Sequence, residues 1–285
     1  MIKRVKEIMK IDFIKVDILN SVKNVIDLSL AHKQDYFPVF DEDTLVGIIT
    51  YKELMNAHPN RIIADAMTEQ YLSVSLDESI WDAKDILDNN DTDILLVMDG
   101  HKLAGVIDRT NLYIEIGKYY DPLTGLYNSS YLYSNAVKLI EKGQGVSVVF
   151  IDINNFGQID KEYGHTLGDM VLKEIAQTLK SISNDGFLCR YGGDEFAILT
   201  TFNATECEQF AMHLQNLVSK NSYLGKIKVS ISVGIAGGKR GKTRLQNPLS
   251  VICNLINLAS LASTKAKMNE NKLKVEDFVD IESIA

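Results

Sequence analysis

The stretch FLCRYGGDEFAIL at residues 187–199 predicts a β-hairpin. Its two apolar arms, FLCRY and EFAIL, are each as long as a short strand, and Gly192, Gly193 and Asp194 separate them. Glycine adopts positive φ without a steric penalty, so this turn can reverse the chain tightly. The sequence therefore predicts two paired strands with an acidic residue in the turn between them.

Strands and helices are predicted on both sides of this hairpin. VSVVFIDI (146–153) is an apolar run of strand length, and IKVSISVGI (227–235) alternates strictly between apolar residues and others. Apolar residues recur at helical spacing over about 164–182, over 207–218 and over about 248–268. The second half of the chain is therefore predicted as an α+β domain, a largely antiparallel sheet covered by helices.

Two carboxylates are expected at one edge of this sheet. Asp152 ends the strand 146–153, and Asp194 lies in the hairpin turn. Hard oxygen ligands on rigid elements suit Mg²⁺, which takes one or two carboxylates together with substrate phosphates. Two such ions can activate a ribose hydroxyl and neutralise a leaving pyrophosphate. A lone aspartate after a strand is usually a cap or a turn residue, so the prediction depends on the combination.

The first half of the chain contains an internal repeat. LVGIITYKEL (45–54) aligns with LAGVIDRTNL (103–112) at an offset of 103 − 45 = 58 residues, and the same offset pairs Asp41 with Asp99. A register held over a whole unit implies two copies of one supersecondary structure, here β-α-β-β-α. One copy is too small to bury both of its faces, so we expect the two copies to pack together.

At these residues the chain resembles a pair of CBS domains. The resemblance implies a regulatory domain over residues 1–118, with repeats at about 1–58 and 59–116, ahead of a second domain at 119–285. CBS pairs bind adenine nucleotides in the clefts between repeats, and a Ser/Thr-x-x-Asp motif after the last strand holds the ribose.

The two copies depart from that motif in this chain. The first copy reads TYKE, from Thr50 to Glu53, and the second reads DRTN, beginning at Asp108. Thr50, Glu53 and Asp108 are the ligand candidates for an adenine nucleotide. The alternative is a ligand-free dimerisation module in which these polar residues only cap helices.

Four motifs of the second half resemble, in order and spacing, the GGDEF family of diguanylate cyclases. They are DPLTGLYN (121–128), FIDINNFGQIDKEYGHTLGDMVLKEIA (150–176), RYGGDEFAIL (190–199) and VSISVGIA (229–236). The resemblance implies a fold like that of polymerase palm domains and class III adenylyl cyclases. It also implies condensation of two GTP into cyclic di-GMP and two pyrophosphates at the interface of two such domains, with Mg²⁺ or Mn²⁺ as cofactor.

The same resemblance assigns roles to individual residues. Asp152, Asp194 and the backbone carbonyl of Ile153 correspond to metal ligands. Glu195 is the neighbouring acid, a candidate for deprotonating the attacking 3′-hydroxyl or for contacting the metal. The positions that correspond to substrate-binding residues are Phe156, Asp160, His165, Asp169, Gly192, Gly193 and Lys267. For His165 the alternative is a helix-start residue that packs against Tyr163.

Three family positions are changed. Gly157 and Asn271 stand where the family has Lys and Arg, and Asp160 stands where it has Asn. Charge-assisted hydrogen bonds contribute about 1.5–3 kcal/mol each, so the loss of two cations is expected to weaken the binding of a triphosphate. Lys161 and Lys272 lie beside the changed positions and are candidates to replace the missing cations.

The RxxD inhibitory motif of many relatives would lie at 183–186, where this chain reads SNDG. Product inhibition through that site is therefore not expected.

Composition excludes some partners. The formal net charge of −8 argues against a broad basic face for nucleic acid. No run approaches the roughly 18 apolar residues that span a membrane. The three cysteines have no CxxC spacing, which favours reduced thiols. We expect a cytoplasmic protein without nucleic-acid or membrane partners. The resemblance to the GGDEF and CBS families further implies a homodimer.

The leading hypothesis is an active, Mg²⁺-dependent diguanylate cyclase regulated by its CBS pair. The alternative is a degenerate GGDEF domain that binds GTP or cyclic di-GMP as a regulatory module, and a third candidate is a cyclase that makes another cyclic dinucleotide. Intact Asp152 and Asp194 favour the enzyme, whereas Gly157 and Asn271 favour the module.

Overall fold

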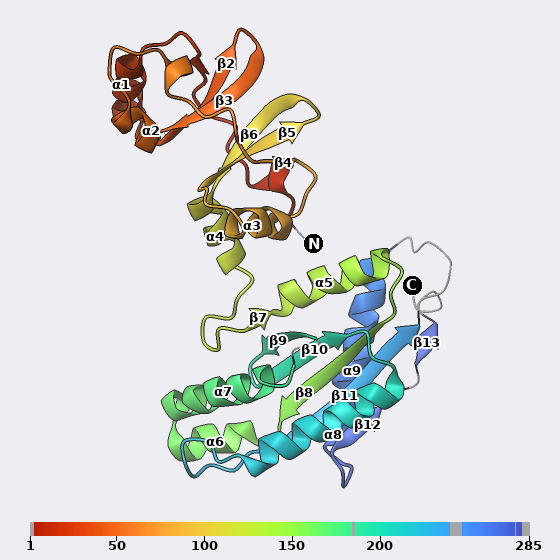
Figure 1. Cartoon of the computed structure of the whole chain (residues 1–285). Helices are drawn as coiled ribbons and strands as arrows, with labels where there is room; N and C mark the ends of the chain where they lie inside the picture. The colour runs from red at the N-terminus through yellow and green to blue at the C-terminus, as the bar shows by residue number, and fades with distance from the viewer. Residues whose placement is uncertain (1–2, 184–185, 240–246, 277, 281–285) are drawn as a thin grey trace. The chain divides into compact units, whose positions relative to one another are not determined.

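The computed structural model describes residues 3–183, 186–239, 247–276 and 278–280. Contacts within the chain separate two compact units between Gly117 and Lys118 (Figure 1). Each unit is described by itself.

The first unit consists of two copies of one β-α-β-β-α structure. The elements are β1 (Val16–Asp17), α1 (Val22–His32), β2 (Tyr36–Asp41), β3 (Thr44–Thr50) and α2 (Tyr51–Asn56), then β4 (Ser73–Ser75), α3 (Ile80–Asp88), β5 (Ile94–Asp99), β6 (Lys102–Asp108) and α4 (Arg109–Gly117). Each copy forms a three-stranded sheet with one parallel and one antiparallel pair, and both β-hairpins have a register shift at equivalent positions, after Val39 and after Val97. The predicted repeat is confirmed in the structure.

Each repeat is completed by a segment from outside its own β-α-β-β-α run. Lys10 exchanges backbone hydrogen bonds of 3.0 and 2.9 Å with Val106 of the second repeat, and Thr68 exchanges two of 3.0 Å with Ile48 of the first. The crossing segment passes so close to β6 that a Cβ at Gly105 would lie 2.8 Å from the carbonyl oxygen of Lys10. Only glycine fits there, because any side chain would displace the segment.

A shared apolar cluster joins the two repeats. It contains Tyr36 and Ile48 from the first repeat and Ile94, Leu96 and Val106 from the second. The two copies therefore bury against each other the faces that neither could bury alone.

The second unit is a mixed sheet covered by helices. Its elements are β7 (Tyr127–Asn128), α5 (Ser129–Glu141), β8 (Val146–Ile153), α6 (Phe156–Tyr163), α7 (His165–Lys180), β9 (Phe187–Gly192), β10 (Glu195–Thr200), α8 (Ala204–Lys220), β11 (Ile231–Lys239), α9 (Pro248–Ala266), β12 (Leu273–Val275) and β13 (Val279–Asp280). The strand order is β12-β11-β8-β10-β9-β7, and β13 also pairs with β11. The four central strands are antiparallel, as predicted, and the short outer strands are parallel to their neighbours.

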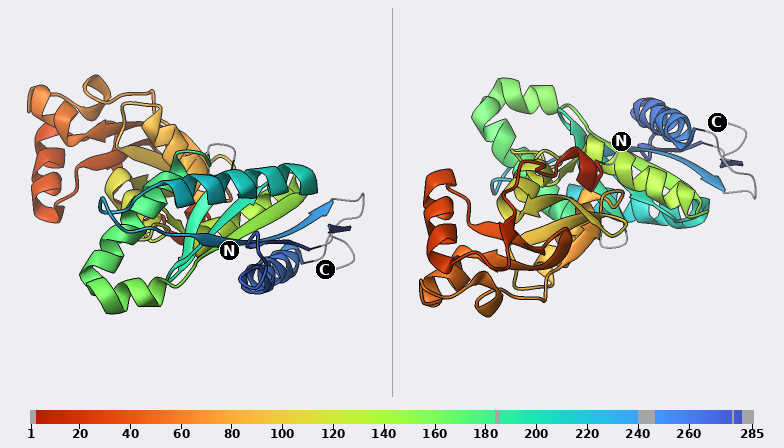
Figure 2. Two further views of the ribbon diagram at one scale, coloured as in Figure 1. Left: turned by 90° about the horizontal axis from the view of Figure 1, so that it is seen from below. Right: turned by 90° about the horizontal axis from the view of Figure 1, so that it is seen from above.

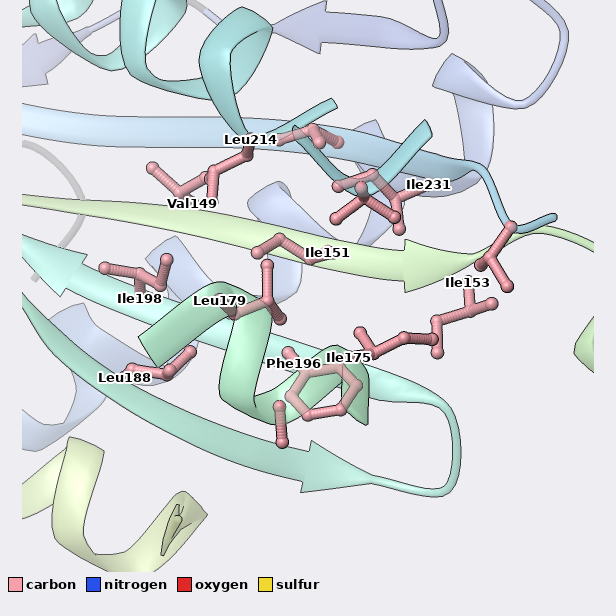
Figure 3. Close-up of a cluster of buried hydrophobic side chains, with 14 of the residues drawn as sticks. Val149, Ile151, Ile153, Ile175, Leu179, Leu188, Phe196, Ile198, Leu214 and Ile231 are labelled. Atoms are coloured by element: carbon pink, nitrogen blue, oxygen red, sulfur yellow. The ribbon is translucent and has the colours of Figure 1, made fainter. Parts of the chain in front are cut away.

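Strand β8 lies at the centre of this unit and is buried along its whole length. Val149, Ile151 and Ile153 belong to one core cluster, together with residues of α7 and α8. Figure 3 shows these three side chains beside Ile175, Leu179 and Leu214. Val148 and Phe150 point the other way, into a cluster with α5 and α9. Burial on both faces explains why the sequence of β8 is apolar apart from Ser147 and Asp152.

Helix α9 is a core helix of this unit. Among the described residues it alone has the length and apolarity of a membrane span, contrary to the expectation that no segment would. However, it packs on β8 and β11 and buries a stripe of apolar side chains there. Figure 2 shows it, in dark blue, lying along β11. The helix packs closely on β11 at Gly234. A Cβ at this position would collide with the backbone of Ala259 in α9.

Some element boundaries predicted from the sequence were wrong. Strand β11 begins at Ile231 rather than at residue 227, because Tyr223 and Ile227 close a turn through backbone bonds of 2.8 and 2.9 Å. Ile227 and Val229 are nevertheless buried in the same cluster as Ile231, so the face assignment was correct. Helices α5 and α6 were not anticipated.

Candidate active site

Three carboxylates lie at one end of the central strands. In the antiparallel pair of β8 and β10, Glu195 stands opposite Asp152. The backbone N–H of Ile153 donates to the carbonyl oxygen of Asp194, at 3.3 Å, so the hairpin turn is held against the end of β8. Figure 3 shows Ile153 at the tip of β8, near the turn that joins β9 and β10. Strand register thus brings Glu195 to Asp152, and the hairpin turn adds Asp194 beside them.

Burial and neighbouring acidic groups raise the pKa of Asp194 and of Glu195. Burial raises the pKa of Asp194 above its ordinary value, and the charge of Asp152 raises it further. Burial and the charges of Asp152 and Asp194 raise the pKa of Glu195 in the same way. Lys267 opposes both shifts. Like charges crowded into a partly dry site favour a bound cation.

Asp152 meets the requirements of a metal ligand. It is 7% exposed, and its Oδ1 is buried without a hydrogen bond. Lys267 Nζ lies 2.8 Å from that oxygen, but the contact does not have hydrogen-bond geometry. Within the described ranges, no three His, Cys, Asp or Glu side chains form a complete metal cage. An ion such as Mg²⁺ does not need one, since it binds through one or two carboxylates plus substrate phosphates.

The hairpin turn is anchored by Arg190. Its Nε and Nη2 donate to the carbonyl oxygen of Gly193, at 2.9 and 2.7 Å, and its Nη1 donates to both carboxylate oxygens of Asp121, at 3.2 Å each. Gly193 has φ +47°, a conformation that favours glycine. Burial alone would raise the pKa of Asp121, but bonds from Thr124 and the charge of Arg190 lower it. Sequence reasoning missed these positioning residues, although both lie in quoted motifs.

The helices α6 and α7 bring Asp160 and His165 together. Asp160 Oδ2 lies 3.1 Å from His165 Nδ1, across the turn at Gly164, whose φ is +82°. The other carboxylate oxygen of Asp160 occupies the place of a side chain at Gly168, where a Cβ would collide with it. His165 is 91% exposed by side chain, so it does not pack against Tyr163.

Two further substrate-site candidates differ in burial. Asp169 is exposed one helical turn after His165, so both lie on one face of α7. Phe156 is 9% exposed and belongs to the core cluster on which α6 and α7 rest. Phe156 therefore packs in the core under α6 and α7, the helices that carry Asp160, His165 and Asp169. Its contact with a substrate stays a prediction.

The changed positions have distinct surroundings. A Cβ at Gly157 would meet no atom within 4 Å. Helix α9 ends at Ala266, so Asn271 does not lie on it, and its Oδ1 accepts a bond of 3.2 Å from the N–H of Leu273. Lys272 Nζ donates to the carbonyl oxygen of Lys267, at 3.4 Å. Lys161 is exposed in the last turn of α6.

The position expected for an inhibitory motif includes residues 184–185, which lie outside the described residues.

The ligand candidates of the first unit act as helix caps. Thr50 Oγ1 accepts from the N–H of Glu53 at 3.5 Å, and Glu53 Oε2 accepts from the N–H of Thr50 at 2.7 Å. Asp108 accepts from the N–H and the side-chain amide of Asn111, at 2.8 and 2.6 Å, and pairs with Lys10 Nζ at 2.8 Å. This geometry agrees with the capping alternative. Nucleotide binding by these residues stays a prediction.

Two family models match the chain. The model described as "Diguanylate cyclase, GGDEF domain" matches residues 118–270, and the model described as "CBS domain" matches residues 5–60 and 63–118. The matches meet where contacts separate the two units.

Known proteins resemble the chain over part of their length. It is 36% identical over 103 residues to "Diguanylate cyclase VdcA" of Vibrio cholerae, covering 35% of this chain and 30% of that one. It is 31% identical over 170 residues to "Probable diguanylate cyclase DgcT" of Escherichia coli, covering 56% and 36%. The matched regions thus span about a third of each relative. Among solved structures, diguanylate cyclase SiaD of Pseudomonas aeruginosa, in complex with its activator SiaC, superposes with TM-score 0.50 at 26% identity, covering 59% of this chain and 65% of that one.

Proposed function

Because the chain belongs to the GGDEF family of diguanylate cyclases and has a CBS pair ahead of that domain, we propose that it condenses two GTP into cyclic di-GMP and two pyrophosphates. The observation that supports this most directly is the pairing of Glu195 with Asp152 across β8 and β10, with Asp194 in the adjoining turn. A module that only binds nucleotide does not need these carboxylates, whereas phosphoryl transfer with a divalent ion uses one or two of them as metal ligands.

In the proposed mechanism Asp152, Asp194 and the backbone carbonyl of Ile153 hold a divalent ion, Mg²⁺ or Mn²⁺. When bound, the ion neutralises the triphosphate and favours ionisation of the attacking hydroxyl. Glu195 accepts the proton of the 3′-hydroxyl. Burial and neighbouring charges raise its pKa toward the working pH, which improves a general base.

The bond changes balance in each half-reaction. The 3′-oxygen of one GTP bonds to the α-phosphorus of the other, the bond from that phosphorus to the pyrophosphate breaks, and the proton passes to Glu195. The backbone of Gly192 and Gly193 approaches the phosphates, since neither glycine has a side chain to obstruct it. The open surroundings of both glycines support this role. A Cβ on Gly192 or Gly193 would meet no protein atom within 4 Å, so there is room for a phosphate beside the backbone.

Different residues are proposed to bind the guanine base and the triphosphate of GTP. Asp160, His165 and Asp169, on α6 and α7, are the proposed contacts of the guanine base. A carboxylate accepts from the N1–H and the 2-amino group of guanine, which adenine does not present in the same pattern. Lys267 is the proposed contact of the triphosphate.

The reaction needs two catalytic domains, since each holds one GTP. We therefore propose a homodimer in which the CBS pair aligns the catalytic halves, and in which an adenine nucleotide near Thr50 and Glu53 or Asp108 shifts the output. Such a ligand must bind the productive and unproductive arrangements with different affinities. A cytoplasmic location without membrane or nucleic-acid partners stays a prediction from composition.

A second candidate is a regulatory module that binds GTP or cyclic di-GMP without turnover. It is favoured by the surroundings of two changed positions. Gly157 presents no side chain, and the side chain of Asn271 bonds to the backbone of Leu273 instead of offering a cation. Both positions would otherwise neutralise phosphate charge.

The decisive experiment is incubation of the purified chain with GTP and Mg²⁺, followed by chromatographic separation of the products. We expect cyclic di-GMP from the wild type and none from Asp194→Asn. Glu208→Gln, an exposed carboxylate change on α8, is the matched control and should retain full turnover. Nucleotide binding without product would favour the module, and a different cyclic dinucleotide would identify a related cyclase.

A further inference from the structure

Lys267 contacts the carboxylate of Asp152, which is the strongest candidate for a metal ligand. It is the first residue after α9, and its Nζ is 2.8 Å from Asp152 Oδ1. The acceptor is the buried partner, since the Asp152 side chain is 11% exposed and the Lys267 side chain 42%. One cation of the chain itself thus neutralises the oxygen that otherwise has no partner.

An ammonium on that oxygen would repel a divalent ion that binds there. Mg²⁺ requires its ligands at about 2.0–2.1 Å in an octahedral arrangement, and the Asp152 Oδ1 is already approached by Lys267. Two cations on one oxygen repel each other strongly in a partly buried site. Metal binding at this oxygen is therefore opposed by Lys267 and becomes more favourable when the ammonium moves away.

Lys267 is able to leave without a change of fold. The end of α9 is held by the packing of the helix on β11, and the carbonyl oxygen of Lys267 accepts a bond from Lys272. Its side chain is half exposed and has four rotatable methylenes, so only the ammonium needs to move. The two other phosphate-facing positions of the family are Gly157 and Asn271 here, so Lys267 has no cationic substitute at either.

We propose that Lys267 is a stand-in for the metal ion in the nucleotide-free chain and that it moves to the triphosphate when the ion binds. This proposal rests on the proposed function. Its consequence is positive coupling: the ion alone must displace Lys267 without compensation, whereas an ion arriving with a triphosphate gives the released ammonium a new anionic partner. The chain would then bind the divalent ion weakly alone and strongly together with nucleotide.

The test is binding of Mn²⁺ to the full chain, followed through the electron paramagnetic resonance signal of the free ion. Lys267→Met should bind Mn²⁺ without nucleotide about two- to fivefold more tightly than the wild type, the range expected for one partly exposed ion pair. A GTP analogue that cannot release pyrophosphate should tighten Mn²⁺ binding strongly in the wild type and much less in the variant.

Lys265→Met is the matched control, because Lys265 lies on the same helix but pairs with Glu276, at 3.1 Å. It should leave both affinities unchanged. In an Asp152→Asn background, Lys267→Met should have no further effect on Mn²⁺ binding, since the ion pair is already absent. Circular dichroism checks that each variant is folded, and Lys267→Gln offers a second neutral side chain.

Equal or weaker Mn²⁺ binding by folded Lys267→Met and Lys267→Gln would overturn the proposal, as would an absence of Mn²⁺ binding in every variant with analogue present. These outcomes differ from a failure of the proposed function. Coupling without formation of cyclic di-GMP would refute the cyclase and leave the role of Lys267 intact, whereas turnover without coupling would do the reverse.

Discussion

Arg190 donates to both carboxylate oxygens of Asp121, 69 residues away in the chain, while its other nitrogens hold the carbonyl of Gly193. One guanidinium therefore connects the start of the catalytic unit to the turn beside Asp194. The pair is nearly buried, at 14% and 16% side-chain exposure. The guanidinium is thus held by acceptors on two sides, Asp121 and Gly193, which fixes its orientation.

Asp121→Asn should therefore destabilise the chain by about 1–3 kcal/mol, the range for removing one charged partner from a largely buried hydrogen-bonded pair. It should also lower the rate of product formation more than it raises the KM for GTP, because the turn would lose its position rather than its phosphate contacts. Urea denaturation and steady-state kinetics measure the two effects. A variant with normal stability and kcat would contradict the anchoring role.

The acidic site gives a pH dependence of definite sign. The pKa values of Asp194 and Glu195 are raised above their ordinary 3.8 and 4.5. Their contribution to stability is fully present below the unfolded-state values and is lost as the pH rises through the folded-state values. Without metal, Asp194→Asn should therefore melt at a higher temperature than the wild type at pH 7.

That difference in Tm between Asp194→Asn and the wild type should shrink as the pH falls through the raised pKa values. Thermal melts in the presence of a chelator, at several pH values, measure it. A difference that stays constant between pH 7 and pH 4 would show that proton binding by Asp194 does not contribute.

Substitutions at Thr50, the N-cap of α2, can distinguish a structural role from ligand binding in the CBS pair. Thr50→Ala removes the side-chain acceptor of α2, which should lower the free energy of unfolding by about 1 kcal/mol, and Thr50→Ser should restore it. Calorimetric titration of the full chain with AMP, ADP and ATP tests the ligand role. Heat of binding that disappears in Thr50→Ala but not in Thr50→Ser would assign a nucleotide to this cleft.

Restoring a cation at Gly157 should strengthen the binding of GTP. The space around Gly157 is open, so a lysine enters without a clash. One regained contact of about 1–2 kcal/mol corresponds to roughly a tenfold gain in kcat/KM, since about 1.4 kcal/mol is a factor of ten. Kinetics of Gly157→Lys measure this gain.

Asn271→Arg should give less than Gly157→Lys, because it removes the hydrogen bond that the N–H of Leu273 donates to Asn271 Oδ1. If Lys161 already neutralises the same phosphate, Gly157→Lys should change little and Lys161→Ala should be damaging. Activity that is indifferent to all three changes would mean that the triphosphate lies elsewhere.

The sequence predicted what depends on local pattern. The 58-residue repeat, the hairpin around Gly192 and Gly193 and the shared face of the alternating apolar residues of β11 all follow from spacing and turn chemistry. It could not predict contacts between distant segments. The bond from Arg190 to Asp121 and the approach of Lys267 to Asp152 depend on where whole elements pack, and the end of α9 at Ala266 depends on the turn that follows.

The two CBS repeats are interlaced, and this constrains how the module can work. Because the segment around Lys10 completes the sheet of the second repeat and the segment around Thr68 completes that of the first, neither repeat is a self-contained folding unit. Cutting the chain between them would leave each half with an unpaired strand edge. The pair should therefore melt in one cooperative transition, and a ligand that tightens one repeat must tighten both. The duplicated sequence therefore forms a single folding unit.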